Sequence, residues 1–256
     1  MVILLDIDGT VLNSNHEIQN DTLHDIKVFS ETNRIILMSA RKPSSVRLIS
    51  KQLGLKEKLI VCYNGALLLN GYEKISEHFL PSNQVSYIYK LAKKLNISIN
   101  IYSYDSWYVD HTNSFIEKEA QIIAEQPILL TDKLENLLIH KVLLIGSENK
   151  LAYIKKYTSK INDLLITHSK NNYLEITHSK ASKKNAFDFL KSYLLLNSDE
   201  TLAIGDGHND IDLLKEVSIG VAMGNSSEDV KKAADFITYS NNKNGVGYAL
   251  RSLLKS

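Results

Sequence analysis

Leu4-Leu5-Asp6-Ile7-Asp8-Gly9-Thr10 is the stretch that decides the fold of this chain of 256 residues. Residues 2–5 are all apolar, as in a strand that is buried on both faces of a parallel sheet. Side chains two positions apart point to the same side of a strand, so Asp6 and Asp8 meet just past its carboxyl end. Open α/β sheets bind their ligands at this edge, and the stretch therefore predicts a ligand site.

Two carboxylates held together need a cation, a shared proton or both, because their negative charges repel. Mg²⁺ prefers oxygen ligands and leaves coordination positions open for the oxygens of a phosphate. The same residues are also compatible with an ordinary strand end that is followed by an Asp-Gly turn. The stretch by itself therefore has two interpretations, a cation site and a plain turn.

The composition is that of a soluble globular protein, with 44% hydrophobic and 23% charged residues. A formal net charge of +1 provides no field that would attract nucleic acid or an anionic membrane. The single cysteine, Cys62, lies in an apolar run and is expected to be a core residue. The chain opens directly on a strand and contains no apolar run long enough to span a bilayer, so we predict a cytoplasmic protein without nucleic-acid or membrane partners.

The N-terminal part of the chain alternates between apolar strands and amphipathic helices. Strands are predicted at 34–38 and 59–62, and helices at 19–32 and after Pro43. This β-α-β-α-β order implies a parallel sheet with right-handed crossovers. Residues 67–71 then indicate a hairpin.

The pattern changes between residues 81 and 180, where strands follow one another directly. This order indicates an antiparallel sheet with helices on one face. From residue 181 the first pattern returns, with a strand at 201–204 and a later helix that is expected to be capped by Ser226. The predicted fold is an α/β, doubly wound parallel core, residues 1–80 and 181–256, with an inserted α+β domain, residues 81–180.

Polar side chains follow four of the predicted core strands. They are Asp6 with Asp8, Ser39, Asn64-Gly65, and Asp206 with Asp210. Parallel strands have their carboxyl ends at one edge of the sheet, so these groups are expected to converge there. Residues 205–210, Gly-Asp-Gly-His-Asn-Asp, lie on a strand-to-helix turn whose helix N-terminus favours anions. A Gly-rich turn with helix-capping aspartates is the alternative interpretation of that segment.

In these motifs and in their order, the chain resembles phosphatases of the haloacid dehalogenase (HAD) superfamily. The resemblance is to the Cof type, whose C2-type (IIB) α/β cap is inserted after the third core strand. The matching segments are Asp6–Thr10, Met38–Arg41, Ser182-Lys183 and Gly205–Asp210 for the four motifs, with Asn64-Gly65 and Gly245-Val246 in their expected places. Ala40 departs from the family, which more often has Gly there; this change would stiffen the loop without removing the Ser39 hydroxyl.

The resemblance implies a Rossmann-like core and a two-step phosphoryl transfer. Asp6 would be the nucleophile that forms an aspartyl-phosphate, and Asp8 would protonate the leaving alcohol and then deprotonate water. Mg²⁺ would be held by the carboxylates of Asp6 and Asp206 and by the backbone carbonyl of Asp8, with Asp210 acting through water. We add the hypothesis that crowding by Asp6 raises the pKa of Asp8.

The resemblance also assigns residues to the phosphate and to the rest of the substrate. The phosphoryl oxygens would be bound by Ser39, Lys183, Asn209 and the amides near Ile7 and Ala40. Arg41, Asn64 and Gly65 would lie at the substrate. The implied partner is a small phosphate ester, and we expect a monomer or a weak homodimer.

The predicted insertion carries the information about the substrate. Residues 81–180 contain no arginine, whose planar fork would favour binding of a second phosphate, although lysine can substitute. A small monophosphate, such as a sugar phosphate, is therefore favoured over a bisphosphate. The aromatic residues of this region are candidates to contact a sugar, but are more simply explained as part of the core and sheet surface of the insertion; they are Tyr102, Tyr104, Trp107 and Tyr108.

Two other functions fit the same motifs. A sugar phosphomutase or phosphotransferase would pass the phosphoryl group to another alcohol, and the missing arginines argue against it. A non-catalytic phosphoacceptor switch would use the fold as a sensor, and it would not need the second acid, Asp8.

Overall fold

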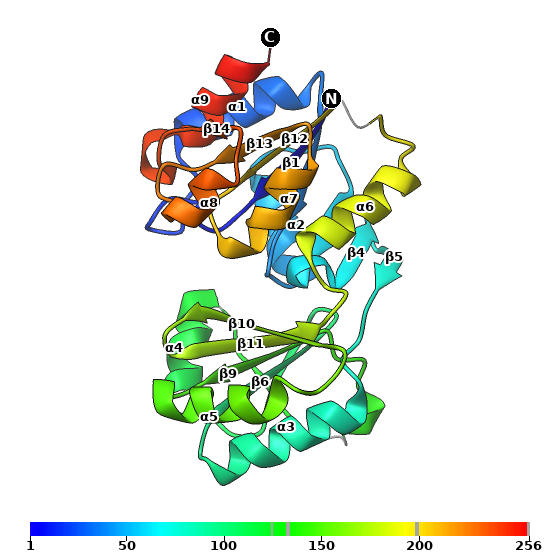
Figure 1. The fold of residues 1–256 in the computed structure, drawn as a ribbon, viewed down its shortest axis with the longest axis vertical. Helices are drawn as coiled ribbons and strands as arrows, with labels where there is room; N and C mark the ends of the chain where they lie inside the picture. The colour runs from blue at the N-terminus through cyan, green and yellow to red at the C-terminus, as the bar shows by residue number, and fades with distance from the viewer. Residues whose placement is uncertain (124, 132–133, 198–199, 255–256) are drawn as a thin grey trace. The chain divides into compact units, whose positions relative to one another are not determined.

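The structure is a computed structural model that describes residues 1–123, 125–131, 134–197 and 200–254. The chain divides into two compact units (Figure 1). The first consists of Met1–Ser76 and Ser182–Ser256, and the second of Glu77–Ala181. The insertion expected at residues 81–180 therefore corresponds to a unit whose boundaries lie within a few residues of that range.

The first unit is built on an eight-stranded sheet with the order β14-β13-β12-β1-β2-β3-β4-β5 (Figure 1). Its strands are β1 (Val2–Asp6), β2 (Arg34–Met38), β3 (Leu59–Cys62), β4 (Leu67–Asn70), β5 (Glu73–Glu77), β12 (Thr201–Gly205), β13 (Ile219–Ala222) and β14 (Phe236–Ile237). All pairs from β14 to β3 are parallel, and β4 is antiparallel to β3. The predicted α/β fold with a parallel core is confirmed. Strand β1 lies inside the sheet, between β12 and β2, and its five residues are all buried, as expected for such a strand.

Helices cover this sheet with their apolar faces. They are α1 (Asn20–Ser30), α2 (Pro43–Gln52), α6 (Lys183–Tyr193), α7 (Ile211–Glu216), α8 (Glu228–Lys232) and α9 (Gly245–Leu253), with short 3₁₀ turns η1 (Tyr63–Gly65), η4 (His208–Asp210) and η5 (Asn241–Lys243). Leu4 and Ile36 of the sheet belong to one buried cluster with Phe187 and Leu190 of α6. This packing fixes the first turn of α6, which follows directly from Ser182, against the sheet.

The predicted cap of the helix after β13 is wrong by one residue. Ser227, not Ser226, is the N-cap of α8, and its side chain makes no capping hydrogen bond. The backbone N–H of Ser226 donates instead to the carbonyl of Met223 at 3.0 Å. The turn after β13 therefore takes one more residue, and the helix starts later than the Ser-Ser sequence indicates.

The second unit contains a six-stranded sheet with the order β10-β11-β9-β6-β7-β8. Its strands are β6 (Ser98–Ser103), β7 (Ser106–Val109), β8 (Ile128–Leu129), β9 (Lys141–Ile145), β10 (Leu164–Lys170) and β11 (Tyr173–His178), and its helices are α3 (Ser82–Lys94), α4 (Ser114–Ile123), α5 (Glu148–Thr158) and η2 (Leu134–Asn136). The sheet is antiparallel except for the β7–β8 pair. β8 is two exposed residues long, and so short a strand has no sequence pattern to predict it. The sequence predicts a helix from Ser114 to Ala124, and Ala124 lies outside the described residues.

Two aromatic residues of the second unit, Trp107 and Tyr102, are buried in its interior. Trp107 is fully buried and donates its indole N–H to Asn100 Oδ1 at 2.9 Å. Tyr102 is buried and stacks on Trp107 with ring centroids 6.3 Å apart. These two rings form part of the unit's interior. Within the described ranges of the chain, no helix has the length and apolar character needed to cross a bilayer.

Candidate active site

A buried lysine between two carboxylates forms the centre of the site. Asp6 ends β1, and Lys183 is the first residue of α6, whose cap Ser182 accepts a hydrogen bond from Asn185 N at 3.1 Å. Lys183 Nζ donates to Asp6 Oδ1 and, at 2.6 Å, to Asp210 Oδ1. The lysine is only 1% exposed, so its charge is balanced entirely by groups of the protein.

Burial and neighbouring charges shift the pKa values of both Asp6 and Lys183. Burial raises the pKa of Asp6, Lys183 opposes that rise, and Asp210 and Asp206 add to it, so that the net pKa lies well above the ordinary value. Burial lowers the pKa of Lys183, but the charges of Asp210 and Asp6 raise it more, and the lysine is held in its charged form. One lysine does not balance three carboxylates, and the site therefore favours a further cation.

Three carboxylates meet at this point of the sheet edge. Asp6, Asp206 and Asp210 each offer an oxygen, and these oxygens lie within 4.8 Å of one another. Gly9 has a φ of +80°, and a Cβ at this position would collide with the Asp206 carboxylate. A set of oxygen donors with excess negative charge fits a hard divalent cation such as Mg²⁺, and these residues would hold it.

The carboxylate of Asp206 is held from two sides. Thr10 Oγ1 donates to Asp206 Oδ1 at 3.2 Å, and Asn225 Nδ2 donates to Asp206 Oδ2 at 3.3 Å. Burial, followed by the charge of Asp210, raises the pKa of Asp206 to about 6. The metal-free protein therefore carries an unfavourable charge here at neutral pH.

We expect the substitution Asp206→Asn to stabilise the metal-free protein. The pKa of this carboxyl is about 4 in the unfolded chain and higher in the folded protein. Its ionisation therefore destabilises the fold increasingly as the pH rises between these two pKa values, and the full destabilisation persists above the folded pKa. The variant should gain about 1–3 kcal/mol in the free energy of unfolding at pH 7 in EDTA. Urea unfolding in EDTA measures this gain, which should shrink towards about pH 4. The gain should be lost in Mg²⁺, which stabilises only the wild type.

Asp212→Asn is the matched control, because Asp212 is an exposed acid on the following helix, α7. Its change should be within about 0.5 kcal/mol at every pH. An Asp206→Asn variant that is less stable than wild type in EDTA at pH 7 would contradict the account of charge repulsion.

Asp8 is held by Arg41 and is not one of the three clustered carboxylates. Arg41 Nε and Nη2 donate to the two oxygens of Asp8 at 2.7 and 2.6 Å, and His16 Nδ1 lies 3.8 Å from Asp8 Oδ1. Burial raises the pKa of Asp8, but the hydrogen bonds and charge of Arg41 lower it more, so the net pKa is below the ordinary value. The hypothesis that Asp6 raises the pKa of Asp8 is therefore wrong, since the nearest charge is the guanidinium.

Removing the Arg41 side chain should change how stability depends on pH. A carboxyl with a lowered pKa contributes stability above its unfolded pKa, about 3.9, and that contribution is lost as the pH falls through the folded pKa. Arg41→Met should lower the free energy of unfolding at pH 7 by less than about 1 kcal/mol, because the pair is partly exposed. Urea unfolding at decreasing pH should show this difference vanish in acid, and a difference that grows there would contradict it.

A strained turn after β3 positions the loop that contains Ser39. Tyr63, Asn64 and Gly65 have positive φ values of 53°, 56° and 104° in succession, an arrangement that non-glycine residues rarely adopt. The N–H of Asn64 donates to the carbonyl of Ser39 at 2.9 Å, and that of Tyr63 to the carbonyl of Arg41 at 3.1 Å. A Cβ at Gly65 would overlap the Ser182 backbone, so the glycine permits close contact with the segment that carries Lys183.

The turn also reaches the fourth motif. Asn209 Nδ2 donates to Asn64 Oδ1 at 2.9 Å. Ser39 is 1% exposed, and its Oγ accepts the N–H of Arg41 at 3.2 Å. The four predicted strand ends thus converge in the first unit, with Asp6, Lys183, Asp206 and Asp210 in one cluster.

Asn225 also lies at the site, although the sequence predicts no role for it. It follows β13 in the way that the other polar residues follow their strands, and this position is the signal that could have identified it. His208, which also received no role, lies in the turn of the fourth motif.

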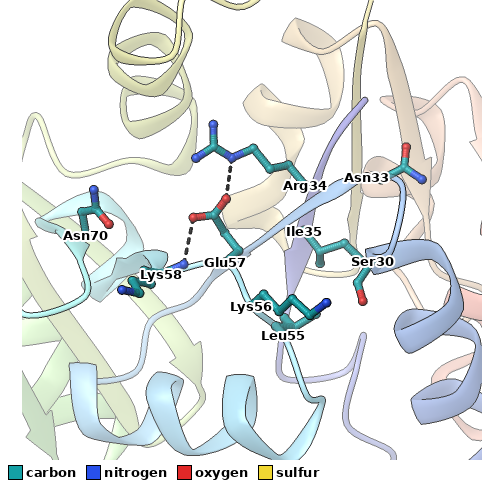
Figure 2. A pocket seen from close by; sticks show the side chains of 9 residues that line it. All are labelled: Ser30, Asn33, Arg34, Ile35, Leu55, Lys56, Glu57, Lys58 and Asn70. Carbon is teal, nitrogen blue, oxygen red and sulfur yellow. Dashed lines mark hydrogen bonds and ion pairs between the residues drawn. The ribbon is translucent and has the colours of Figure 1, made fainter.

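A surface cavity of about 390 Å³ lies at the opposite ends of the strands. Figure 2 shows its lining, where Arg34, the first residue of β2, is ion-paired with Glu57, which precedes β3. Lys56, Lys58 and Asn70 also line it. The cluster around Asp6 lies at the carboxyl ends of the strands, where parallel sheets bind their ligands. This cavity is therefore separate from that cluster.

Residues 3–250 match the family model of haloacid dehalogenase-like hydrolases. The chain belongs to this family. A Haemophilus influenzae protein that is provisionally named a phosphatase is 31% identical over 97% of this chain and 96% of its own. The Bacillus subtilis 5-amino-6-(5-phospho-D-ribitylamino)uracil phosphatase YitU is 26% identical over 98% of this chain and 96% of its own.

The solved structure of a haloacid dehalogenase-like hydrolase from Bacteroides thetaiotaomicron superposes with a TM-score of 0.92. It is 28% identical, and the match covers 99% of both chains. The predicted family is confirmed by the match to the family model, and the predicted enzyme class, a phosphatase, by the names of the relatives.

Proposed function

We propose that this protein is a Mg²⁺-dependent phosphomonoester hydrolase that acts on a small phosphorylated metabolite through an aspartyl-phosphate at Asp6. The observation that carries the proposal is the buried cluster in which Lys183 binds both Asp6 and Asp210 beside Asp206. A sugar phosphate or a similar ester is the substrate class we favour. The name of YitU, which describes a phosphate ester of a ribityl chain, supports this class.

The first step forms a bond between a carboxylate oxygen of Asp6 and phosphorus and breaks the bond from phosphorus to the ester oxygen. Bound Mg²⁺, held by Asp6, Asp206 and the carbonyl of Asp8, would neutralise the nucleophile and the phosphate, which otherwise repel. Lys183, Ser39 and Asn209 would bind phosphoryl oxygens, together with backbone amides near Ile7 and Ala40.

Asp8 would exchange a proton with the reacting oxygens in both steps. The leaving alcohol takes a proton from Asp8 in the first step, and Asp8 removes one from water in the second, when water attacks phosphorus and releases Asp6. The second role needs the ionised form, which the Arg41 pair favours. The first role needs the protonated form, so we propose that the leaving group displaces Arg41 when it reaches Asp8.

Hydrolysis is favoured over phosphoryl transfer to a second sugar. A phosphomutase must bind its substrate in two orientations and so hold a second phosphate, for which residues 81–180 offer no arginine. We propose that the second unit, Glu77–Ala181, sets the specificity for the leaving group. Release of inorganic phosphate without an added acceptor alcohol would distinguish the hydrolase from the transferase.

The proposal is tested by phosphate release from p-nitrophenyl phosphate and from a panel of sugar phosphates. Turnover should require Mg²⁺ and stop in EDTA. Asp8→Asn should lower kcat on sugar phosphates by about 10²–10⁴, because their alcohols need the proton. Turnover that survives EDTA would overturn the proposed mechanism, and inactivity on every ester would favour the non-catalytic switch.

A further inference from the structure

Asn225 links two parts of the chain that carry groups for the metal. Its Nδ2 donates to the carbonyl of Gly9 at 2.9 Å and to Asp206 Oδ2 at 3.3 Å. Gly9 follows Asp8, whose carbonyl is a proposed metal ligand, and Asp206 follows β12. One amide group therefore bonds to the loop after β1 and to the carboxylate after β12.

The orientation of this amide is determined by its neighbours. Asn225 Oδ1 accepts the backbone N–H of Asn241 at 2.9 Å. With the amide reversed, its NH₂ would face that N–H and its oxygen would face the Gly9 carbonyl, and both contacts would be repulsive. The donor is therefore directed at Gly9 and Asp206.

The backbone around Asn225 is also anchored. The N–H of Gly224 donates to the carbonyl of Tyr239 at 3.0 Å, and that of Met223 donates to the carbonyl of Gly205 at 3.0 Å. Asn241 Nδ2 donates to the buried carbonyl of Leu12 at 2.9 Å. The first two bonds tie the segment after β13 to the end of β12 and to the segment after β14, and the third ties Asn241, which itself bonds to Asn225, to the loop after β1. The amide is therefore in place before any ligand binds.

We propose that Asn225 is a positioning residue of the divalent-metal site, which holds the Asp206 carboxylate in register with the Asp8–Gly9 loop. The inference rests on the proposed function, since that function supplies the metal. Both oxygens of Asp206 accept hydrogen bonds from described residues, Oδ1 from Thr10 and Oδ2 from Asn225. Groups that orient metal-ligating carboxylates in this way contribute about 10- to 100-fold to metal affinity.

Titration calorimetry of the metal-free protein with Mg²⁺ tests the inference without any substrate. Asn225→Ala should raise the Kd for Mg²⁺ by about 10- to 100-fold. The thermal shift between EDTA and Mg²⁺ should fall in parallel, while melting in EDTA reports whether the variant is folded. Asn225→Ser, which keeps a polar group in the loop, gives the same test if the alanine variant does not fold.

Asn242→Ala is the matched control. Asn242 is in the same C-terminal segment, and its side chain bonds to Ser14 instead, through Oδ1 at 3.0 Å and Nδ2 at 2.8 Å. Its Mg²⁺ affinity should equal that of the wild type. Unchanged affinity in folded Asn225 variants would overturn the inference and leave the proposed function standing, whereas a wild type that binds no Mg²⁺ would overturn both.

Discussion

Asp6→Asn should reduce the hydrolysis of phosphate esters by at least about 10⁴-fold, because an amide oxygen cannot replace the attacking carboxylate. The expected loss is in kcat, and it should be the same for p-nitrophenyl phosphate and for sugar phosphates. A good leaving group does not help when the nucleophile is missing. Phosphate release at saturating Mg²⁺ measures the effect.

The control for this substitution is Asp188→Asn on α6. Asp188 is an acid near the surface that pairs with Lys184 at 2.6 Å, four residues earlier on the same helix. Its loss should leave kcat and KM unchanged. Residual activity of Asp6→Asn within tenfold of the wild type would show that another group attacks phosphorus.

Lys183→Met should both destabilise the protein and abolish activity. The substitution leaves Asp6 and Asp210 buried without their cation, and removing one partner of a buried ion pair costs about 3–5 kcal/mol. Urea unfolding in EDTA at pH 7 measures that loss. Mg²⁺ should recover part of it, because the metal replaces some of the missing positive charge.

Lys184→Met separates this effect from a general loss of charge. Lys184 is next in sequence, but it pairs with Asp188 on the partly exposed side of α6, so little change in stability or activity is expected. A Lys183→Met variant as stable as the wild type in EDTA would contradict the view that this lysine compensates the buried carboxylates.

The sequence was sufficient to predict the core fold, because β1, β2 and β3 are short apolar runs whose polar ends mark one sheet edge. Strand β2 runs from Arg34 to Met38 and β3 from Leu59 to Cys62, as the sequence predicts. Hydrophobic runs bounded by turn residues indicate such strands well. The two exposed residues of β8 have no such pattern and were not predicted.

It was harder to predict which side chains pair with one another at the site than to predict which residues of the sequence lie there. Crowding by Asp6 was expected to set the pKa of Asp8, yet the structure pairs Asp8 with Arg41, which is distant in sequence. Asn225 contacts Gly9 across most of the chain. Neither pairing follows from the spacing of residues, because both depend on which loops the strand order brings together.

The central claim is that Asp6 becomes phosphorylated, and trapping this intermediate tests it most directly. In Asp8→Asn, p-nitrophenol still leaves without a proton from residue 8, whereas water lacks its base, so the aspartyl-phosphate should accumulate. Quenching this variant with borohydride after addition of Mg²⁺ and p-nitrophenyl phosphate should reduce the acyl phosphate to homoserine, which peptide mass spectrometry should find at position 6. Release of p-nitrophenol with residue 6 unmodified in every peptide would contradict the account.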